Sequence, residues 1–170
     1  SKIPQEYVVL AVYPSYELME RVLCVYGEEK ERLEISGRDF VEREDTKIVE
    51  LVEDILRGER GIVVHAVAGG KLTEGVEITR EGRSLIGAVV IAGLPFPEPN
   101  DYTNACLERL AELYGREKAW EYVVLVPAVV KMKQAFGRAL RSSEDRACFF
   151  ILDRRALAKR IVEMLGVKPR

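Results

Sequence analysis

Four short apolar runs, separated by segments with helical periodicity, limit this chain to few folds. They span residues 7–13, 61–67, 85–92 and 146–152. A short continuous apolar run is typical of a strand that is buried on both faces, as the strands of parallel sheets are. Two parallel strands need a crossover connection, usually a helix, which packs on a face of the sheet. The alternation therefore predicts an α/β domain with a mostly parallel sheet and helices on both faces.

The helices between these runs are predicted from apolar spacing and from capping residues. Ser15 and Asp45 are suited to cap the helices that follow them. Pro127 fits the first turn of a long helix better than a helix interior. The expected helices span 16–26, 46–56, 101–114, 117–125, 127–140 and 154–165, and a short strand is possible over 33–35.

The length of 170 residues suits a single domain, 1–170, with a sizeable buried core. With 48% hydrophobic and 32% charged residues, the composition excludes a disordered tail. The longest apolar run, 122–130, is far shorter than the ~18 residues that a membrane span needs, so no membrane partner is expected. No basic stretch precedes an apolar one near the N-terminus, so no secretory signal is expected either.

The three cysteines are odd in number and far apart, at positions 24, 106 and 148. This argues against a disulfide scaffold and against a CxxC metal site, so no metal ligands are assigned and a reducing compartment is expected. Asn and Gln are scarce while charged residues are abundant, a composition that favours a thermophile. We therefore expect a cytoplasmic protein of a thermophilic prokaryote.

The net charge of −2 hides an uneven distribution. Residues 17–60 carry 8 Lys and Arg against 14 Asp and Glu, a net charge of −6. Residues 131–170 carry 11 against 4, a net charge of +7. The basic end suits a phosphate-bearing partner, and it equally suits an ordinary solvated helical face.

The tripeptide Gly69-Gly70-Lys71 has the look of a phosphate-binding P-loop but fails its pattern. A P-loop needs Gly five residues before the Gly-Lys pair and Ser or Thr after it, where this chain has His65 and Leu72. His65 is the only histidine, so the chain has no other histidine that could serve in a Ser/His/Asp arrangement. Because it lies inside an apolar strand, we expect a packed, neutral core residue rather than a catalytic one.

Two other segments carry groups that suit phosphate. The loop over 69–77 follows a strand and offers backbone N–H groups, a hydroxyl and an ammonium, although an ordinary strand–helix turn has the same composition. Gln134, Arg138 and Arg141 have helical spacings of four and three, which predicts one helix face. Two adjacent arginines repel each other unless an anion lies between them; Glu144 or Asp145 would serve, as would a bound phosphate.

The order of these segments resembles the second motor domain of XPD-type DNA helicases of superfamily 2. The opening VVLAVYPSYELME is similar to motif IV of that family, GGKLTEGVEI to motif V, and residues 134–141 to the QxxGRxxR pattern of motif VI. The sequence GLPFP stands between the last two, and FFILDRRAL follows them. The resemblance covers about residues 7–160 and implies a RecA-like three-layer domain.

The resemblance further implies the C-terminal half of a motor, cut from a longer chain, that binds ATP and Mg²⁺ in a cleft against a first RecA-like domain. That first domain would supply the P-loop, the magnesium-binding acidic box and an iron–sulfur cluster whose four cysteine ligands are absent here. Arg138, Arg141 and Gln134 are implied to be catalytic, reaching the γ-phosphate or its water, with Arg141 as the arginine finger.

Further residue roles follow from the same resemblance. Gly75, Glu77 and Gly137 are implied to lie near the nucleotide; the family usually has Asp at position 77, which leaves direct ribose contact by the longer Glu77 open. Contacts to the backbone of single-stranded DNA are implied for Ser15, Tyr16, Lys71 and Thr73. The isolated chain would then hydrolyse no ATP, and the full-length protein would move 5′ to 3′ and serve DNA repair.

Two other functions fit the same residues. A non-catalytic nucleic-acid-binding or protein-binding module that retained the helicase fold is favoured by Glu77 and by the acidic region 17–60. A nucleotide-binding enzyme complete in itself is opposed by the missing P-loop.

Overall fold

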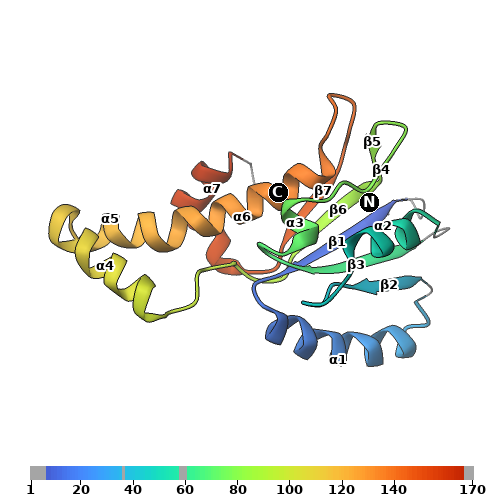
Figure 1. Ribbon diagram of the computed structural model, residues 1–170, viewed down its shortest axis with the longest axis horizontal. Coiled ribbons are helices and arrows are strands. Elements are labelled where there is room, and N and C mark those ends of the chain that lie inside the picture. The colour runs from blue at the N-terminus through green and yellow to red at the C-terminus, as the bar shows by residue number, and fades with distance from the viewer. Residues whose placement is uncertain (1–6, 36, 58–60, 167–170) are drawn as a thin grey trace.

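The computed structural model describes residues 7–35, 37–57 and 61–166 and contains a five-stranded parallel sheet (Figure 1). The strand order is β2-β3-β1-β6-β7. Of the neighbouring pairs, β2 and β3 are joined through α2, and β6 and β7 are joined through the helices from α4 to α6. A separate two-stranded antiparallel ribbon pairs β4 with β5. The strands are β1 (Val8–Tyr13), β2 (Arg38–Val41), β3 (Ile62–Val67), β4 (Thr79–Arg80), β5 (Arg83–Ser84), β6 (Ile86–Ile91) and β7 (Cys148–Ile151).

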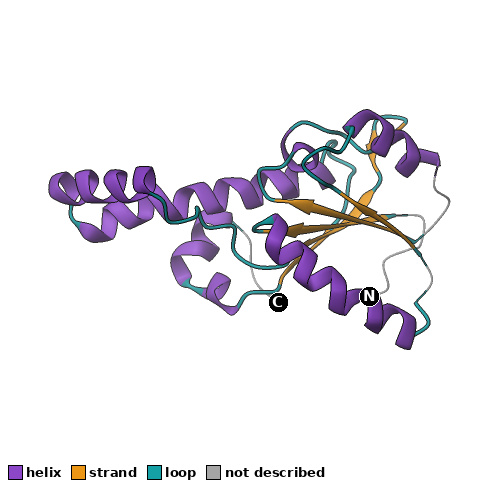
Figure 2. Cartoon of the chain, turned by 60° about the horizontal axis from the view of Figure 1, so that its bottom comes forward, coloured by secondary structure: helices purple, strands orange, loops and turns teal. Residues whose placement is uncertain are grey.

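Helices cover both faces of the sheet, as Figure 2 shows. Helix α1 lies on one face, and α2, α3 and α6 lie on the other. This confirms the predicted α/β fold with a mostly parallel sheet and three layers. The helical elements are α1 (Tyr16–Arg32), α2 (Ile48–Arg57), α3 (Lys71–Glu74), α4 (Asp101–Tyr114), α5 (Arg116–Trp120), the π-helix η1 (Glu121–Leu125), α6 (Val126–Ala139), the 3₁₀-helix η2 (Arg154–Leu157) and α7 (Lys159–Leu165).

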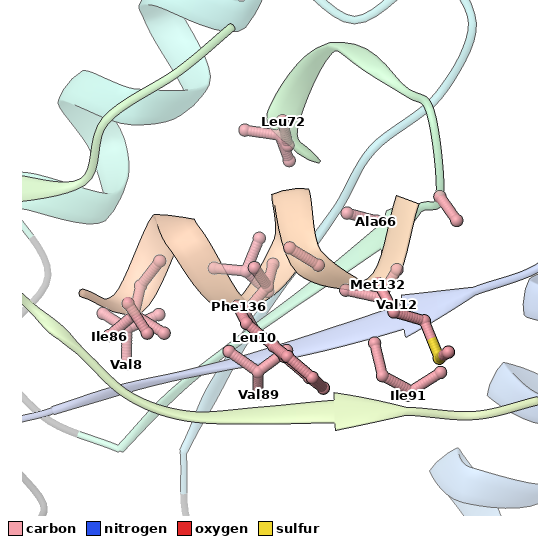
Figure 3. Packing of buried hydrophobic residues seen from close by; sticks show 14 of the residues in the cluster. Val8, Leu10, Val12, Ala66, Leu72, Ile86, Val89, Ile91, Met132 and Phe136 are labelled. Carbon is pink, nitrogen blue, oxygen red and sulfur yellow. The ribbon is translucent and has the colours of Figure 1, made fainter. Parts of the chain in front are cut away.

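The larger core lies between the sheet and α6 (Figure 3). Met132 and Phe136, one turn apart on α6, pack with Leu10 of β1 and Val89 of β6 in this cluster. Leu72 of α3 closes the same cluster from above. Each of these side chains is at least nine-tenths buried, and burial of one such side chain typically contributes roughly 1.5–3 kcal/mol. The core therefore fixes the position of α6 on the sheet.

Helix α6 continues directly from the helical turns before it. Pro127 lies in its first turn, as predicted. The residues that flank η1, Trp120 and Val126, are both in the right-handed helical conformation, so α5, η1 and α6 form one continuous helix. A π-helical turn changes the hydrogen-bonding register, and η1 ends two residues before the proline, which lacks an N–H to donate. The α5 end of the continuous helix, together with α4, extends away from the sheet in Figure 1, whereas α6 packs on it.

Three expectations about local structure are wrong. Residues 33–35 form the turn that ends α1, closed by the Ile35 N–H donating to the Lys30 carbonyl, and the strand lies instead at β2. Strand β2 was missed because Arg38 and Asp39 break its apolar run, which an edge strand tolerates. Asp45 does not cap α2, which begins only at Ile48.

Two other expected helices are present, but their boundaries differ from the predicted ones. Helix α1 continues past residue 26 to Arg32, and the expected helix over 154–165 divides into η2 and α7 at Ala158, whose backbone is extended. The segment after the glycine-rich loop forms the β4–β5 ribbon, which the apolar pattern did not predict.

Candidate phosphate and nucleic-acid site

Residues 68–78, which we call the connecting segment, run the length of the sheet. At its start the Ala68 N–H donates to the carbonyl of Tyr13, the last residue of β1 (2.8 Å). At its end the Ile78 carbonyl accepts from the Leu85 N–H (2.9 Å), and the Leu85 carbonyl accepts from Val8, the first residue of β1 (2.8 Å). The segment therefore joins the carboxyl end of the sheet to its amino end.

Helix α6 runs beside the connecting segment in the opposite direction to β1. A Cβ atom on Gly69 would lie 3.3 Å from Cε of Lys131, so the lysine side chain lies against the start of the segment. Two turns later, Arg138 Nη1 donates to the Val76 carbonyl near the end of the segment (3.2 Å). The glycine-rich residues and the arginines thus lie at opposite ends of the sheet, and the site is not confined to its carboxyl end.

At the carboxyl end, the glycine-rich loop is held by Glu42, which directly follows β2 and is fully buried. Its Oε2 accepts from the Val67 N–H and its Oε1 from the Leu72 N–H, both at 3.1 Å. A Cβ atom on Gly70 would lie 2.7 Å from Glu42 Oε2, so glycine is required there. Sequence reasoning missed Glu42 because β2 itself was missed.

Thr73 is 1% exposed and its hydroxyl is committed to the same loop. The hydroxyl oxygen accepts from the Gly69 N–H, and the hydroxyl proton has two carbonyl acceptors, Val67 and Gly70, each 3.0 Å from that oxygen. In this conformation the side chain has no surface to offer a ligand. The structure therefore places Thr73 as a support of the loop rather than among its exposed groups.

Three other predicted residues at the carboxyl end are less buried than Thr73: Ser15, Tyr16 and Lys71. Lys71 is exposed, and its Nζ donates to the carbonyls of Glu44 (3.0 Å) and Thr46 (3.4 Å). Burial, and then the charges of Glu42 and Glu44, which follow β2, raise the pKa of Tyr16. As predicted, Ser15 caps α1, its Oγ accepting from the N–H of Leu18 at 3.3 Å.

At the amino end, the two arginines converge although they do not share one helix face. Helix α6 ends at Ala139 and the backbone of Leu140 is extended, so Arg141 lies beyond the helix and the predicted common face is wrong. Arg141 Nη2 instead reaches Glu77 Oε1 at 2.9 Å. Burial, and then the like charge of Arg141, lower the pKa of Arg138, while Glu77 opposes this shift.

The carboxylates that the sequence offered as partners for these arginines are used elsewhere. Oδ2 of Asp145 accepts from the backbone N–H groups of Arg141 and Ser142, both at 2.7 Å. These bonds, Ser142 first, hold the pKa of Asp145 below its usual value. Glu144 pairs with Arg83 of the β4–β5 ribbon. Glu77 is therefore the carboxylate that contacts the Arg141 side chain, and Asp145 binds the backbone of the same residue.

The β4–β5 ribbon braces the end of α6. Ser84 is buried, and its hydroxyl donates to the Arg138 carbonyl (3.0 Å) while accepting from the Ile86 N–H (3.2 Å). A helix end leaves its last carbonyls without intrahelical partners, and Ser84 satisfies one of them from the end of β5. No local sequence signal marks this contact, because 54 residues separate its partners.

The remaining predicted residues lie between these groups. Gln134 is partly exposed, one helical turn before Arg138. Gly137 has open space where a Cβ atom would lie, and Gly75 ends α3 by donating its N–H to the Lys71 carbonyl (3.1 Å). Packing therefore does not demand glycine at 137, which leaves the helix surface there uncovered.

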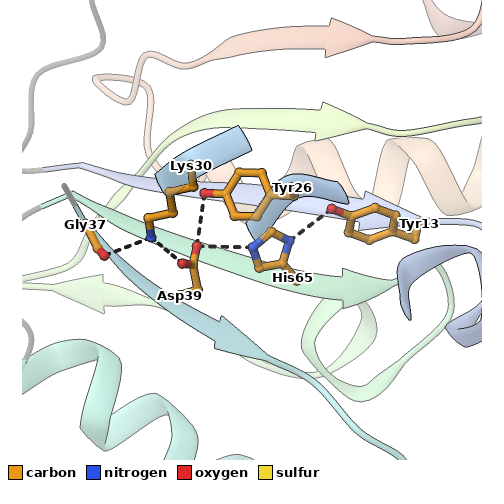
Figure 4. A network of polar contacts seen from close by, with 6 residues as sticks. All are labelled: Tyr13, Tyr26, Lys30, Gly37, Asp39 and His65. Atoms are coloured by element: carbon orange, nitrogen blue, oxygen red, sulfur yellow. Dashed lines mark hydrogen bonds and ion pairs between the residues drawn. The ribbon is translucent and has the colours of Figure 1, made fainter. Parts of the chain in front are cut away.

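His65 belongs to a separate buried network under α1 (Figure 4). The Tyr13 hydroxyl lies 3.0 Å from His65 Nδ1, and His65 Nε2 lies 3.3 Å from Oδ1 of Asp39, which also accepts from Tyr26 and pairs with Lys30. Because the Asp39 carboxylate only accepts, Nε2 carries the proton and Nδ1 accepts from Tyr13. Burial lowers the pKa of His65, and the side chain is 1% exposed, which confirms the predicted neutral core residue.

The comparisons with known proteins agree on one family. The helicase C-terminal domain family matches residues 1–167. This chain belongs to that family. It is 38% identical over 147 residues to the ATP-dependent DNA helicase XPD of Sulfolobus acidocaldarius, covering 86% of this chain and 25% of the relative. It is 28% identical over 180 residues to the ATP-dependent DNA helicase CHL1 of Kluyveromyces lactis, covering 97% of this chain and 21% of the relative.

Solved structures give the same result for the fold. An XPD helicase structure superposes with a TM-score of 0.78 at 35% identity, covering 95% of this chain and 27% of the other. The chain is therefore an XPD-type helicase C-terminal domain with a RecA-like fold, and it spans about a quarter of the length of these relatives. Cys24, Cys106 and Cys148 are free thiols, and no helix among the described residues is long and apolar enough to cross a membrane.

Proposed function

We propose that this chain is the second half of an ATP-driven DNA helicase motor, which completes its ATP site against a first RecA-like domain of the same protein. The observation that carries the proposal is the connecting segment, which joins Lys71 at one end of the sheet to Glu77 and the arginines at the other. A single piece of chain, hydrogen-bonded to the sheet at both ends, then links the proposed DNA-facing end to the proposed phosphate-facing end.

At the amino end, Arg138 and Arg141 bind the γ-phosphate, and Gln134 contacts the phosphate or its attacking water. Arg138 suits this role because its Nη1 has one backbone partner while its buried Nε has no partner in the described residues. An unsatisfied buried donor calls for an explanation, and an anion that reorients the guanidinium supplies one. Gly75, Glu77 and Gly137 lie around the nucleotide in this proposal.

The chemistry needs charge stabilisation more than covalent participation. Phosphoryl transfer spreads negative charge over the transferred oxygens, and an arginine supplied by a second domain is worth roughly 10³–10⁵ in rate. Arg141 is placed for this because it projects beyond the end of α6. The planar fork of arginine also matches two phosphate oxygens at once, which a lysine does not.

The metal that accompanies ATP does not fit the residues in hand. No group of three His, Cys, Asp or Glu side chains that suits a metal ion lies together within residues 7–35, 37–57 and 61–166. We therefore assign Mg²⁺, the P-loop and any iron–sulfur cluster to the rest of the protein, and no step of this chain depends on holding them.

At the carboxyl end, Ser15, Tyr16 and Lys71 contact the sugar–phosphate backbone of single-stranded DNA, and Thr73 supports the loop that carries Lys71. Contacts to phosphate fix the position of a strand without reading its bases, as a translocating motor requires. Affinity that falls with added salt follows from the release of counterions.

The test compares the isolated chain with the full-length protein. We expect the isolated chain to fold and to hydrolyse no ATP, and the full-length protein to hydrolyse ATP faster when single-stranded DNA is added. Turnover by the isolated chain well above background would contradict the half-motor proposal. A full-length protein that binds DNA with no ATPase at all would instead support the non-catalytic binding module.

A further inference from the structure

The ion pair between Glu77 and Arg141 lies where the proposed function needs a phosphate. Arg141 Nη2 is 2.9 Å from Glu77 Oε1, and the charge of Glu77 acts on Arg138 as well. A carboxylate offers a guanidinium the same kind of charged oxygen acceptors that a phosphate does. In this conformation the finger is therefore already paired, and its partner belongs to the same chain.

In the ion pair between Arg141 and Glu77, another anion could replace the carboxylate. The Arg141 side chain is 27% exposed and that of Glu77 57%, and ion pairs with this much exposure are weak. The root of the finger is fixed, because Asp145 binds the backbone N–H of Arg141. Glu77 precedes the buried Ile78, so its own backbone is anchored too. A change of partner thus needs only side-chain movement between two fixed backbones.

We infer that Glu77 is a positioning residue, which holds Arg141 back on its own domain until the γ-phosphate of ATP displaces it. The inference rests on the proposed function, since it takes Arg141 to be the finger. A phosphate carries more negative charge than a carboxylate and repels the Glu77 side chain while attracting the guanidinium. The two anions therefore compete for one arginine, and Glu77 opposes ATP binding while keeping the finger close to its working position.

The experiment measures equilibrium binding of a non-hydrolysable ATP analogue to the full-length protein and to its Glu77→Gln, Arg141→Ala and double variants. We expect Glu77→Gln to tighten binding about two- to fivefold, the range that a weak, half-exposed pair allows. In the Arg141→Ala background the same change should have a clearly smaller effect, because the competition is gone and only the general effect of the Glu77 charge on phosphate and Arg138 remains. Glu77→Asp should tighten binding like Glu77→Gln, since its carboxylate ends roughly 1.5 Å short of the arginine.

The matched control is Glu74→Gln, which removes an exposed carboxylate three residues away in the same segment. Glu74 takes part in none of the ion pairs among the described residues, so its loss should leave affinity unchanged. Weaker binding on Glu77→Gln would make Glu77 a nucleotide ligand and overturn the inference. Equal tightening with and without Arg141 would overturn it as well, since the effect would be one of general charge.

Turnover separates this inference from the proposed function. If Arg141→Ala keeps turnover near that of the wild type, the finger assignment fails and the inference fails with it. If Arg141→Ala abolishes turnover while Glu77→Gln leaves nucleotide affinity unchanged, the finger stands and only the holding role of Glu77 is wrong.

Discussion

The two ends of the connecting segment are held in different ways. At the carboxyl end, buried Glu42 and Thr73 bind the backbone of the loop through four hydrogen bonds. At the amino end, Glu77 meets Arg141 through one partly exposed ion pair. The loop that carries Lys71 is thus fixed by bonds shielded from water, whereas the proposed phosphate site is held by contacts that a ligand can replace.

Because of this difference, substitutions at the two ends of the connecting segment should affect different properties of the protein. Losing one partner of a buried, hydrogen-bonded charge leaves desolvated groups without compensation, which costs far more than losing an exposed pair. Changes at the carboxyl end should therefore lower the free energy of unfolding. Changes at the amino end should alter ATP hydrolysis with little effect on folding.

The largest effect is expected from Arg141→Ala in the full-length protein. Turnover should fall by about 10³-fold or more, because the transition-state charge loses its partner from the second domain. The melting temperature should stay nearly constant, since removing a side chain from a partly exposed pair usually changes stability by under ~0.5 kcal/mol. Steady-state ATPase and thermal unfolding of the same samples measure the two effects.

The control for that substitution is Arg109→Ala, which removes an arginine from the exposed pair with Glu112 on α4. Arg141→Lys should restore turnover poorly, because a point charge lacks the bidentate fork. A drop of many degrees in melting temperature, or turnover that persists, would make Arg141 a structural partner of Glu77 instead.

The next largest effect is expected from Glu42→Ala. It leaves the N–H groups of Val67 and Leu72 without their acceptor in a buried site, and we expect a loss of about 3 kcal/mol. For a chain of this length that corresponds to a melting temperature lower by roughly 10 °C. Differential scanning calorimetry measures it, with Glu50→Ala on the exposed side of α2 as the control. An unchanged melting temperature would show that the loop does not depend on this carboxylate.

A smaller effect is expected from Thr73→Val, which keeps the shape of the side chain and removes its hydroxyl. The Gly69 N–H then loses its acceptor, and the cost should be about 1–2 kcal/mol, whereas Thr73→Ser should be nearly neutral. Thermal unfolding and DNA affinity are measured together. An unchanged melting temperature with weakened DNA binding would favour the direct DNA contact expected from the sequence over the supporting role.

Apolar patterning and motif order predicted the sheet, the layers and the family. They work because a strand buried on both faces must be apolar, and because the residues of a motif are close in sequence. They failed at β2, where an edge strand needs apolar residues on one face only and includes Arg38 and Asp39. Missing β2 hid Glu42, the residue that holds the glycine-rich loop.

The motif also predicted the two arginines, but not their arrangement. Helical spacing placed Gln134, Arg138 and Arg141 on one face, and the helix ends one residue after Arg138. What ends it is tertiary: Ser84 and Asp145 bind the backbone there, and Glu77 draws the Arg141 side chain across. A pattern within one helix carries no information about partners on other elements.

The smallest effect is expected from Lys71→Ala. Among the described residues its ammonium bonds to two backbone carbonyls at the surface, so the melting temperature should hardly change. In the full-length protein, affinity for single-stranded DNA should fall severalfold for every sequence tested, because a phosphate contact carries no base information. The slope of log affinity against log salt should also become shallower by about 0.7, the value for one phosphate on a single strand.

The control is Lys118→Ala, which removes an exposed lysine on α5. Fluorescence anisotropy over a salt series measures both quantities. If affinity falls for some sequences only, Lys71 reads bases; if affinity and slope stay unchanged, the carboxyl end of the connecting segment is rigid for a reason other than gripping DNA.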